Sequence, residues 1–144
     1  MSDSVFASYA HRFPVRVYYE DTDAAGMVYY ANYLRFAERA RTEMTRMLGV
    51  RHAQLLEENG VFFAVRRCEA DFVAPARLDD HLEVVSQLLS VGGASLNMKQ
   101  TIHRDDMELV KLDVRLACMT MAGKPSRIPS RLREMFSQVI NSEG

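Results

Sequence analysis

Residues 28–48, VYYANYLRFAERARTEMTRML, carry the pattern that decides the fold. Apolar side chains recur there at the three- and four-residue spacing of a single helix face. Those positions are Tyr33, Phe36, Ala37, Ala40, Met44, Met47 and Leu48. Arginine and glutamate mostly fill the other face, and Gly49 is a suitable helix stop. The spacing therefore predicts one long amphipathic helix, on the order of 30 Å in length.

The segment before this helix is predicted to be a strand followed by a turn. Residues 13–20, FPVRVYYE, are rich in β-branched and aromatic side chains, and Pro14 stands near the start, where its missing N–H is tolerated. Residues 21–26, DTDAAG, combine aspartate with glycine and predict a tight turn. Residues 1–12 are small and polar, and we expect them to be a flexible N-terminus.

Beyond Gly49 the sequence predicts a second short helix and a set of strands. The short helix covers residues 52–58 and ends at Gly60. Strand-like segments then follow at residues 61–74, 82–91, 95–103 and 108–121. Turn residues separate these segments, and a basic loop at 124–130 leads into a short amphipathic helix at 131–140.

This order of elements indicates the α+β class, with an antiparallel meander of strands joined by short turns. The long helix has one apolar face and the sheet needs a cover, so the simplest arrangement wraps the sheet around the helix. The length of 144 residues fits one domain, which we assign to residues 13–144.

Composition limits the functional classes. The formal net charge is -1, which excludes a general electrostatic footprint for nucleic acid or for an anionic membrane. The sequence contains neither a signal-peptide pattern at its start nor an apolar run long enough to suggest a membrane span. Cys68 and Cys118 lie in apolar, strand-like runs, so we expect free, buried thiols in a reducing compartment and a cytoplasmic protein.

Several common site types do not fit this sequence. It has no nucleophile-elbow, dinucleotide-binding or phosphate-loop glycine motif, and its four histidines lack metal-ligand spacing. DTDAAG begins like a calcium loop, but the position for the bidentate glutamate holds Asn32. We therefore predict no metal and no redox cofactor.

The remaining candidate is the turn with Asp21 and Asp23, directly before the long helix. Unpaired backbone N–H groups and the positive end of the helix dipole favour a carboxylate there, and they also stabilise an oxyanion. A carboxylate beside such a helix end is equipped for acyl transfer, because it attacks a carbonyl or activates a water. The alternative is an ordinary helix cap or turn residue, worth about 1 kcal/mol.

The segment YYEDTDAAGMVYYANYL, residues 18–34, resembles the signature of the 4-hydroxybenzoyl-CoA thioesterase family of hotdog-fold enzymes. It is most similar to the Tol-Pal-associated acyl-CoA thioesterase branch. The resemblance continues through FFAVRRCEADFVAPARLDDHLEV at 62–84 and GASLNMKQTI at 93–102. It implies a hotdog fold and hydrolysis of a short-chain or aromatic acyl-CoA to free CoA and a carboxylic acid, with coenzyme A present only as part of the substrate.

The resemblance also implies roles for residues near the turn. Asp23 matches the family's catalytic carboxylate, which acts as nucleophile or as general base. Tyr30 matches the position whose backbone N–H contacts the oxyanion, and Gly26 lets the backbone pass close to the thioester. Many members of the branch have histidine where this chain has Tyr30, and a phenol with a pKa of about 10 is a poorer base at neutral pH.

Further binding residues are expected away from the turn. Ser95 follows the glycine hairpin, where the family often has a hydroxyl residue near the acyl pocket of a neighbouring subunit. We expect Phe63, Val65 and Met27 to line the acyl pocket, although core packing explains Phe63 and Val65 equally well. The hairpin Gly92-Gly93-Ala94 lacks the basic residues that touch nucleotide phosphates in related enzymes. Lys124, Arg127 and Arg131 are the substitute patch, and a solvated basic loop is the alternative.

The resemblance further implies a homo-oligomer, a dimer or a homotetramer, with the active site between subunits. The apolar character of both faces of residues 82–91 agrees with such an assembly. Two other functions stay open: a thioesterase acting on acyl-[acyl carrier protein], which the missing basic hairpin favours, and a non-catalytic hotdog protein that binds acyl ligands.

Overall fold

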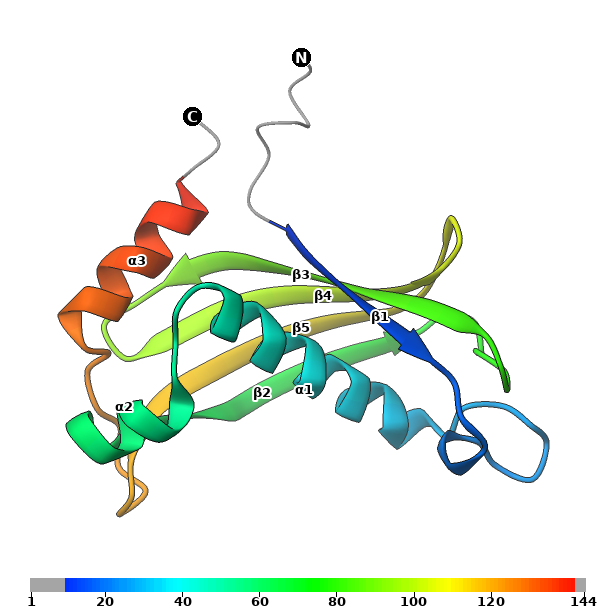
Figure 1. Cartoon of the computed structure of the whole chain (residues 1–144), viewed down its shortest axis with the longest axis horizontal. Helices are drawn as coiled ribbons and strands as arrows, with labels where there is room; N and C mark the ends of the chain where they lie inside the picture. Colours follow the sequence, from blue (N-terminus) through cyan, green and yellow to red (C-terminus); the bar gives the residue numbers. More distant parts are fainter. Residues whose placement is uncertain (1–9, 142–144) are drawn as a thin grey trace.

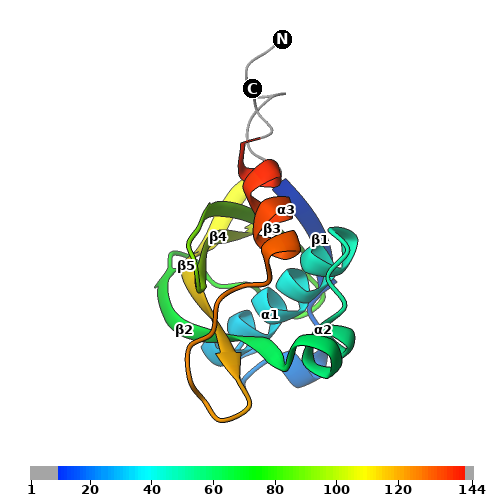
Figure 2. The ribbon, with the colours of Figure 1, turned by 90° about the vertical axis from the view of Figure 1, so that its left-hand side faces the viewer.

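The computed structural model describes residues 10–141 and shows one sheet curved around a central helix (Figure 1). The strands are β1 (Ala10–Arg16), β2 (Val61–Phe72), β3 (His81–Val91), β4 (Ser95–Arg104) and β5 (Met107–Thr120). The helices are α1 (Tyr30–Met47), α2 (His52–Asn59) and α3 (Ser130–Ile140), with a short 3-10 helix, η2, at Tyr19–Asp21. The end-on view in Figure 2 shows the sheet wrapping α1, which confirms the predicted hotdog architecture.

The strand order in the sheet is β1-β3-β4-β5-β2, with every pairing antiparallel. The predicted meander is confirmed for β3, β4 and β5 but is wrong for β2, which pairs with β5 at the far edge. The reason lies in the connection between β2 and β3. Residues 73–80 form a loop rather than a tight hairpin turn, so the chain crosses from one side of the sheet to the other, and β1 pairs with the outer side of β3.

The N-terminal strand begins earlier than predicted. β1 starts at Ala10, inside the segment expected to be flexible, because Ala10–Arg16 pairs along the edge of β3. The part of that expectation covering residues 1–9 lies outside the described residues. The strand also ends early, since the Asp21 carboxylate accepts the Tyr18 N–H and turns the chain into η2.

Helix α1 supplies the centre of the core. Its side chains Phe36, Ala37, Ala40 and Met44 are fully buried against the concave side of the sheet. Met47 was predicted on the same face but is 71% exposed. It lies beyond the last buried apolar side chain of the helix, where the chain turns away at Gly49, which has a φ of +97°. At the end of the sheet where α1 finishes, α3 packs against β3 and closes the core.

The concave face of β2 is left open because α1 packs mainly against β1 and β3. Val65 and Phe72 are accordingly 49% and 44% exposed. The prediction of two buried thiols is correct for Cys118 and wrong for Cys68, which lies on this uncovered strand and is exposed. Within residues 10–141, no helix combines the length and the apolar character that crossing a bilayer requires.

Candidate active site

Asp23 lies in the loop that joins η2 to α1, and the loop is shaped around its carboxylate. The N–H groups of Ala25 and Met27 donate to Asp23 Oδ1 at 2.8 Å and 3.2 Å, and the Asp23 N–H donates to the Met27 carbonyl at 2.8 Å. Gly26 adopts a left-handed φ of +78°, which closes this turn. Oδ2 has no hydrogen-bond partner among residues 10–141, so one carboxylate oxygen is fixed and the other is available.

The N-terminus of α1 follows directly and presents a free donor. Tyr29 is the N-cap residue and makes no side-chain cap hydrogen bond. Its own N–H donates to the Asp21 carbonyl at 3.0 Å, whereas the N–H of Tyr30 has no acceptor within the described part of the chain. An unpaired N–H at the positive end of a helix dipole is suited to an anionic oxygen.

Asp21 has a different environment from Asp23. It is 6% exposed, and its two carboxylate oxygens accept hydrogen bonds from Asn32 Nδ2 at 2.8 Å and from the Tyr18 N–H at 2.9 Å. These bonds join η2 to the first turn of α1. Asp21 therefore organises the turn, while Asp23 keeps an oxygen free.

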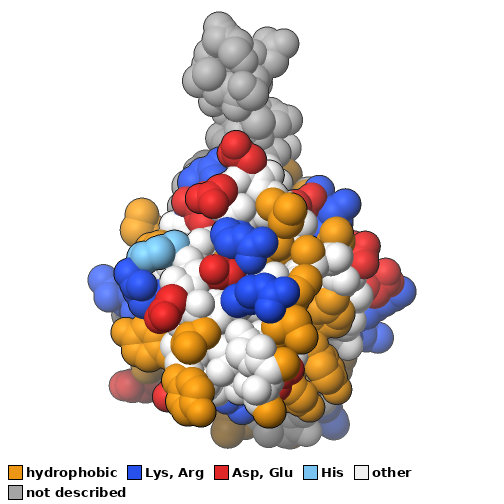
Figure 3. Space-filling model, turned by 90° about the vertical axis from the view of Figure 1, so that its right-hand side faces the viewer, with side chains coloured by type: hydrophobic (Ala, Val, Ile, Leu, Met, Phe, Trp, Pro, Cys, Tyr) orange, Lys and Arg blue, Asp and Glu red, His pale blue; other side chains and the backbone are white. Residues whose placement is uncertain are grey.

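Beside Asp23 and the start of α1 lies a cavity of about 400 Å³. Its lining contains Asp23, Met27, Val28, Tyr29, Tyr30, Tyr33 and residues 72–75. The ring centroid of Phe72 lies 6.0 Å from that of Tyr30 and 5.8 Å from that of Tyr33, so the wall is largely aromatic. Figure 3 views this end of the molecule and shows apolar side chains gathered along its lower part.

Much of this cavity wall was not predicted from the sequence, namely Tyr29, Tyr33, Phe72 and residues 73–75. The sequence signal that could have identified part of this wall is FVAP, residues 72–75, where apolar residues end a predicted strand and a proline follows. The ring centroids of Tyr29 and Tyr30 lie 4.8 Å apart, and the neighbouring Tyr30 phenol raises the pKa of Tyr29. The Tyr30 side chain is 59% exposed at the cavity mouth.

Phe63 and Val65 do not line the Asp23 cavity. They line a second cavity, of about 410 Å³, between β2 and the C-terminal half of α1. Its polar side includes Arg41, whose NH1 donates to Gln100 Oε1 at 2.9 Å. Burial lowers the pKa of the Arg41 guanidinium.

Ser95, Lys124 and Arg127 also lie apart from Asp23, at the opposite end of the sheet (Figure 1). Arg127 packs against Gly93, where an added Cβ would be 3.2 Å from its NH1 atom. Two arginines that were not predicted from the sequence join it there. Arg133 Nε donates to the Gly92 carbonyl at 3.1 Å, and Arg115 NH2 donates to Ser95 Oγ at 3.4 Å. The glycine hairpin is thus surrounded by guanidinium groups from other segments.

Comparisons with known proteins agree with this architecture. The family model described as the thioesterase-like superfamily matches residues 17–136. The acyl-CoA thioesterase YbgC of Haemophilus influenzae is 43% identical over 125 residues, covering 86% of this chain and 92% of the relative. That of Helicobacter pylori (strain 26695) is 47% identical over 133 residues, covering 88% and 97%.

Solved structures give the same result. A probable thioesterase from Bartonella henselae superposes with a TM-score of 0.80 at 38% identity, covering 84% of this chain and 100% of that one. A 4-hydroxybenzoyl CoA thioesterase mutant complexed with 4-hydroxybenzoyl CoA reaches a TM-score of 0.82 at 20% identity, covering 88% and 97%. The second likeness concerns the fold alone.

Proposed function

The chain belongs to the thioesterase-like superfamily, and from that premise we propose that it is an acyl-CoA thioesterase. It hydrolyses a short-chain or aromatic acyl-CoA to free CoA and a carboxylic acid. The observation that carries the proposal is the pairing, at one cavity, of the free Asp23 Oδ2 with the unpaired N–H of Tyr30. The aromatic wall around them is suited to a flat or short acyl group.

The chemistry follows from these two groups. The Tyr30 N–H holds the thioester oxygen as it becomes an oxyanion. In the general-base route, Asp23 Oδ2 takes a proton from water while the water oxygen attacks the carbonyl carbon. The C–S bond then breaks, and the proton passes to the departing thiolate, which leaves as free CoA. In the nucleophilic route, Oδ2 attacks the carbon, the thiolate leaves, and water hydrolyses the mixed anhydride.

Neither route requires a reactant other than water and the thioester. Within the described residues, no cluster of His, Cys, Asp or Glu is suited to hold a metal ion. We place the CoA phosphates at the glycine hairpin of a neighbouring subunit, because the hairpin of the same chain lies at the opposite end of the sheet from Asp23. Arg127, Arg133 and Arg115 supply planar guanidinium donors around that hairpin.

Thiol release from a panel of acetyl-, butyryl-, octanoyl- and benzoyl-CoA tests the proposed activity. We expect at least one ester to release thiol and carboxylic acid in equal amounts above the rate without protein. A parallel arm offers the same acyl groups on acyl carrier protein. Thiol release only from the acylated carrier protein would mean that the acyl donor is acyl carrier protein and not acyl-CoA. Thiol release from neither donor would favour a non-catalytic protein that binds acyl ligands.

The assembly we propose is a dimer across β2. The open edge of β2 and its exposed concave face leave Val65 and Phe72 uncovered. A second copy aligned antiparallel along this strand carries its own Phe63 and Val65 toward the Asp23 cavity of the first. This arrangement unites site residues that one protomer keeps apart, and pairing of such dimers gives a homotetramer.

A charge on this strand tests the dimer. Ala70→Glu places a carboxylate in the middle of the uncovered apolar face without removing an apolar contact, and we expect light scattering to give the mass of a single chain. Leu89→Glu is the matched control, because Leu89 is 49% exposed on the convex side of β3. It will leave dimers intact. An unchanged mass for Ala70→Glu, relative to the native chain, contradicts the β2 interface.

Two narrower assignments complete the proposal. An exposed free thiol, Cys68, is compatible with a reducing compartment, which supports a cytoplasmic location. A role beside the Tol-Pal system rests on the resemblance of residues 18–34 to that branch.

A further inference from the structure

The loop that carries Asp23 is bound along its length to a second loop, residues 73–80. The Val28 N–H donates to the Ala76 carbonyl at 2.9 Å, and the Leu78 N–H donates to the Gly26 carbonyl at 3.0 Å. Met27 and Arg77 form an antiparallel bridge between these bonds. Movement of the second loop therefore moves the backbone that holds the Asp23 carboxylate.

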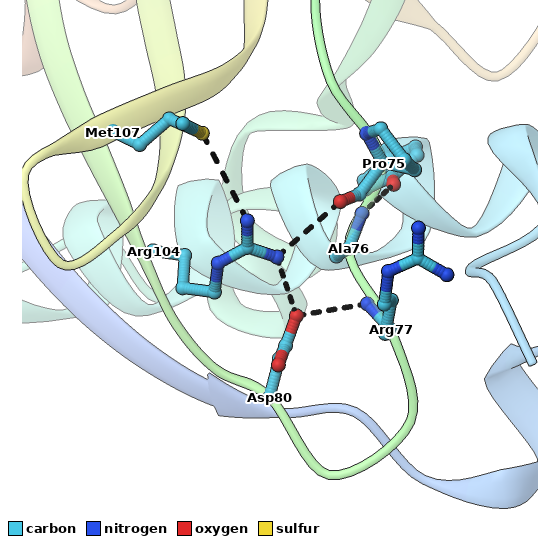
Figure 4. Close-up of polar contacts among 7 residues, drawn as sticks. Pro75, Ala76, Arg77, Asp80, Arg104 and Met107 are labelled. Carbon is cyan, nitrogen blue, oxygen red and sulfur yellow. Dashed lines mark hydrogen bonds and ion pairs between the residues drawn. The ribbon is translucent and has the colours of Figure 1, made fainter.

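The second loop is held in turn by an ion pair to the sheet (Figure 4). Arg104 NH1, at the end of β4, donates to Asp80 Oδ2 at 2.7 Å and to the Pro75 carbonyl at 3.3 Å. The same Asp80 oxygen accepts the Arg77 N–H at 2.8 Å. One guanidinium thus fixes the loop at Pro75 and at Asp80, on either side of the residues that bind the Asp23 loop.

Two further contacts complete this connection. The Tyr33 hydroxyl, from α1, accepts the Ala76 N–H at 2.8 Å in a buried position. The backbone of Asp80 accepts the Val17 N–H at 2.9 Å just beyond β1. The second loop is consequently joined to the sheet, to the helix whose N-terminus holds Tyr30, and to the Asp23 loop.

The ion pair is built to hold a fixed geometry. The side chains of Arg104 and Asp80 are 30% and 22% exposed, so water screens them less than it screens a surface pair. Burial opposes ionisation of Asp80, but the Arg77 N–H and the Arg104 guanidinium outweigh it and hold the pKa of Asp80 below its usual value. By contrast, Arg12 and Glu83 form an exposed pair on the β1–β3 edge, with side chains 63% and 44% exposed.

We propose that Arg104 and Asp80 are positioning residues, which set the Asp23 carboxylate against the N-terminus of α1 through the 73–80 loop. The proposal rests on the proposed thioesterase function. Neither residue lines the Asp23 cavity, so neither contacts the substrate there. They act on the rate because reactions in a preorganised site lose speed steeply when the reacting groups are displaced.

Steady-state kinetics on the best ester of the panel tests this role. We expect Asp80→Asn and Arg104→Met each to lower kcat roughly tenfold to a hundredfold, with KM changed by no more than about twofold. Arg104→Lys will recover part of kcat, because an ammonium keeps a positive charge beside Asp80 but lacks the second nitrogen, NH2, which in arginine donates to Met107 Sδ at 3.8 Å. The double variant will be no slower than the worse single variant, since both residues act through one contact.

Arg12→Met is the matched control, because it breaks an ion pair that has no connection to the Asp23 loop. Its kcat will stay at the native value. If Asp80→Asn and Arg104→Met lower only the melting temperature, or raise KM alone, the two residues are structural and the positioning role is wrong.

Amide hydrogen exchange measures the connection without any substrate. We expect the N–H groups of Val28 and Leu78 to exchange faster in Asp80→Asn and Arg104→Met than in the native chain. The Cys118 N–H, bonded to the Ala94 carbonyl at 2.8 Å at the other end of the sheet, will keep its native rate. Unchanged exchange at Val28 and Leu78 overturns the positioning role. A native chain that cleaves no ester overturns the proposed function and leaves this measurement intact.

Discussion

Replacing Asp23 by asparagine will lower kcat for acyl-CoA hydrolysis by about a thousandfold, with the fold intact. The amide oxygen of asparagine still accepts the Ala25 and Met27 N–H groups that Asp23 Oδ1 accepts, so the loop keeps its shape. The second position becomes an NH2 group, which neither attacks a carbonyl nor takes a proton from water. Initial rates of thiol release and a thermal unfolding curve measure the two halves of this prediction.

Asp21→Asn is the matched control, because it neutralises the other carboxylate of the same turn. Asp21 uses both oxygens as acceptors, for Asn32 Nδ2 and the Tyr18 N–H, and an amide leaves one of those buried donors facing another donor. The cost in unfolding free energy is about 1–3 kcal/mol. Asp21→Asn is therefore expected to lower the stability of the protein, whereas Asp23→Asn is expected to lower kcat. An Asp23→Asn protein that keeps more than about a tenth of the native kcat does not fit a catalytic carboxylate.

The parts of the site that the sequence predicted are those set by local signals. The turn around Asp23 and the start of α1 depend on residues within a few positions of each other, namely aspartate, glycine and the first apolar residues of the helix. The place of β2 in the sheet depends instead on which distant strand it meets. Alternation along Val61–Phe72 predicts a strand, but it carries no information on pairing with β5 rather than β3.

The cavity wall and the positioning pair were missed for a related reason. Phe72 and Tyr33 have the same apolar spacing whether they fill a core or line a cavity, and their ring contact joins segments far apart in the chain. Asp80 stands in a sequence of turn residues, and Arg104 stands directly before another turn. Charged residues at turns are usually solvated, so only the fold shows that these two meet.

Replacing Phe36 by alanine will lower the unfolding free energy by about 3–5 kcal/mol. The Phe36 side chain is fully buried on α1, and its ring meets Tyr33 edge-on with centroids 6.3 Å apart. Truncation leaves a cavity beneath the helix and removes support from Tyr33, whose hydroxyl holds the Ala76 N–H. Urea unfolding at one fixed protein concentration measures the loss, since an oligomer's stability depends on concentration.

Met47→Ala on the same helix is the control for burial in this measurement. Met47 is 71% exposed, so its truncation changes the unfolding free energy by no more than about 0.5 kcal/mol. Equal losses for the two variants would mean that the loss in unfolding free energy does not depend on burial of the side chain against the sheet, since alanine is the better helix former at both positions. A large loss of unfolding free energy for Phe36→Ala alone would show that the stabilisation comes from the buried core around Phe36. The same core supports Tyr33, whose hydroxyl holds the 73–80 loop beside Asp23.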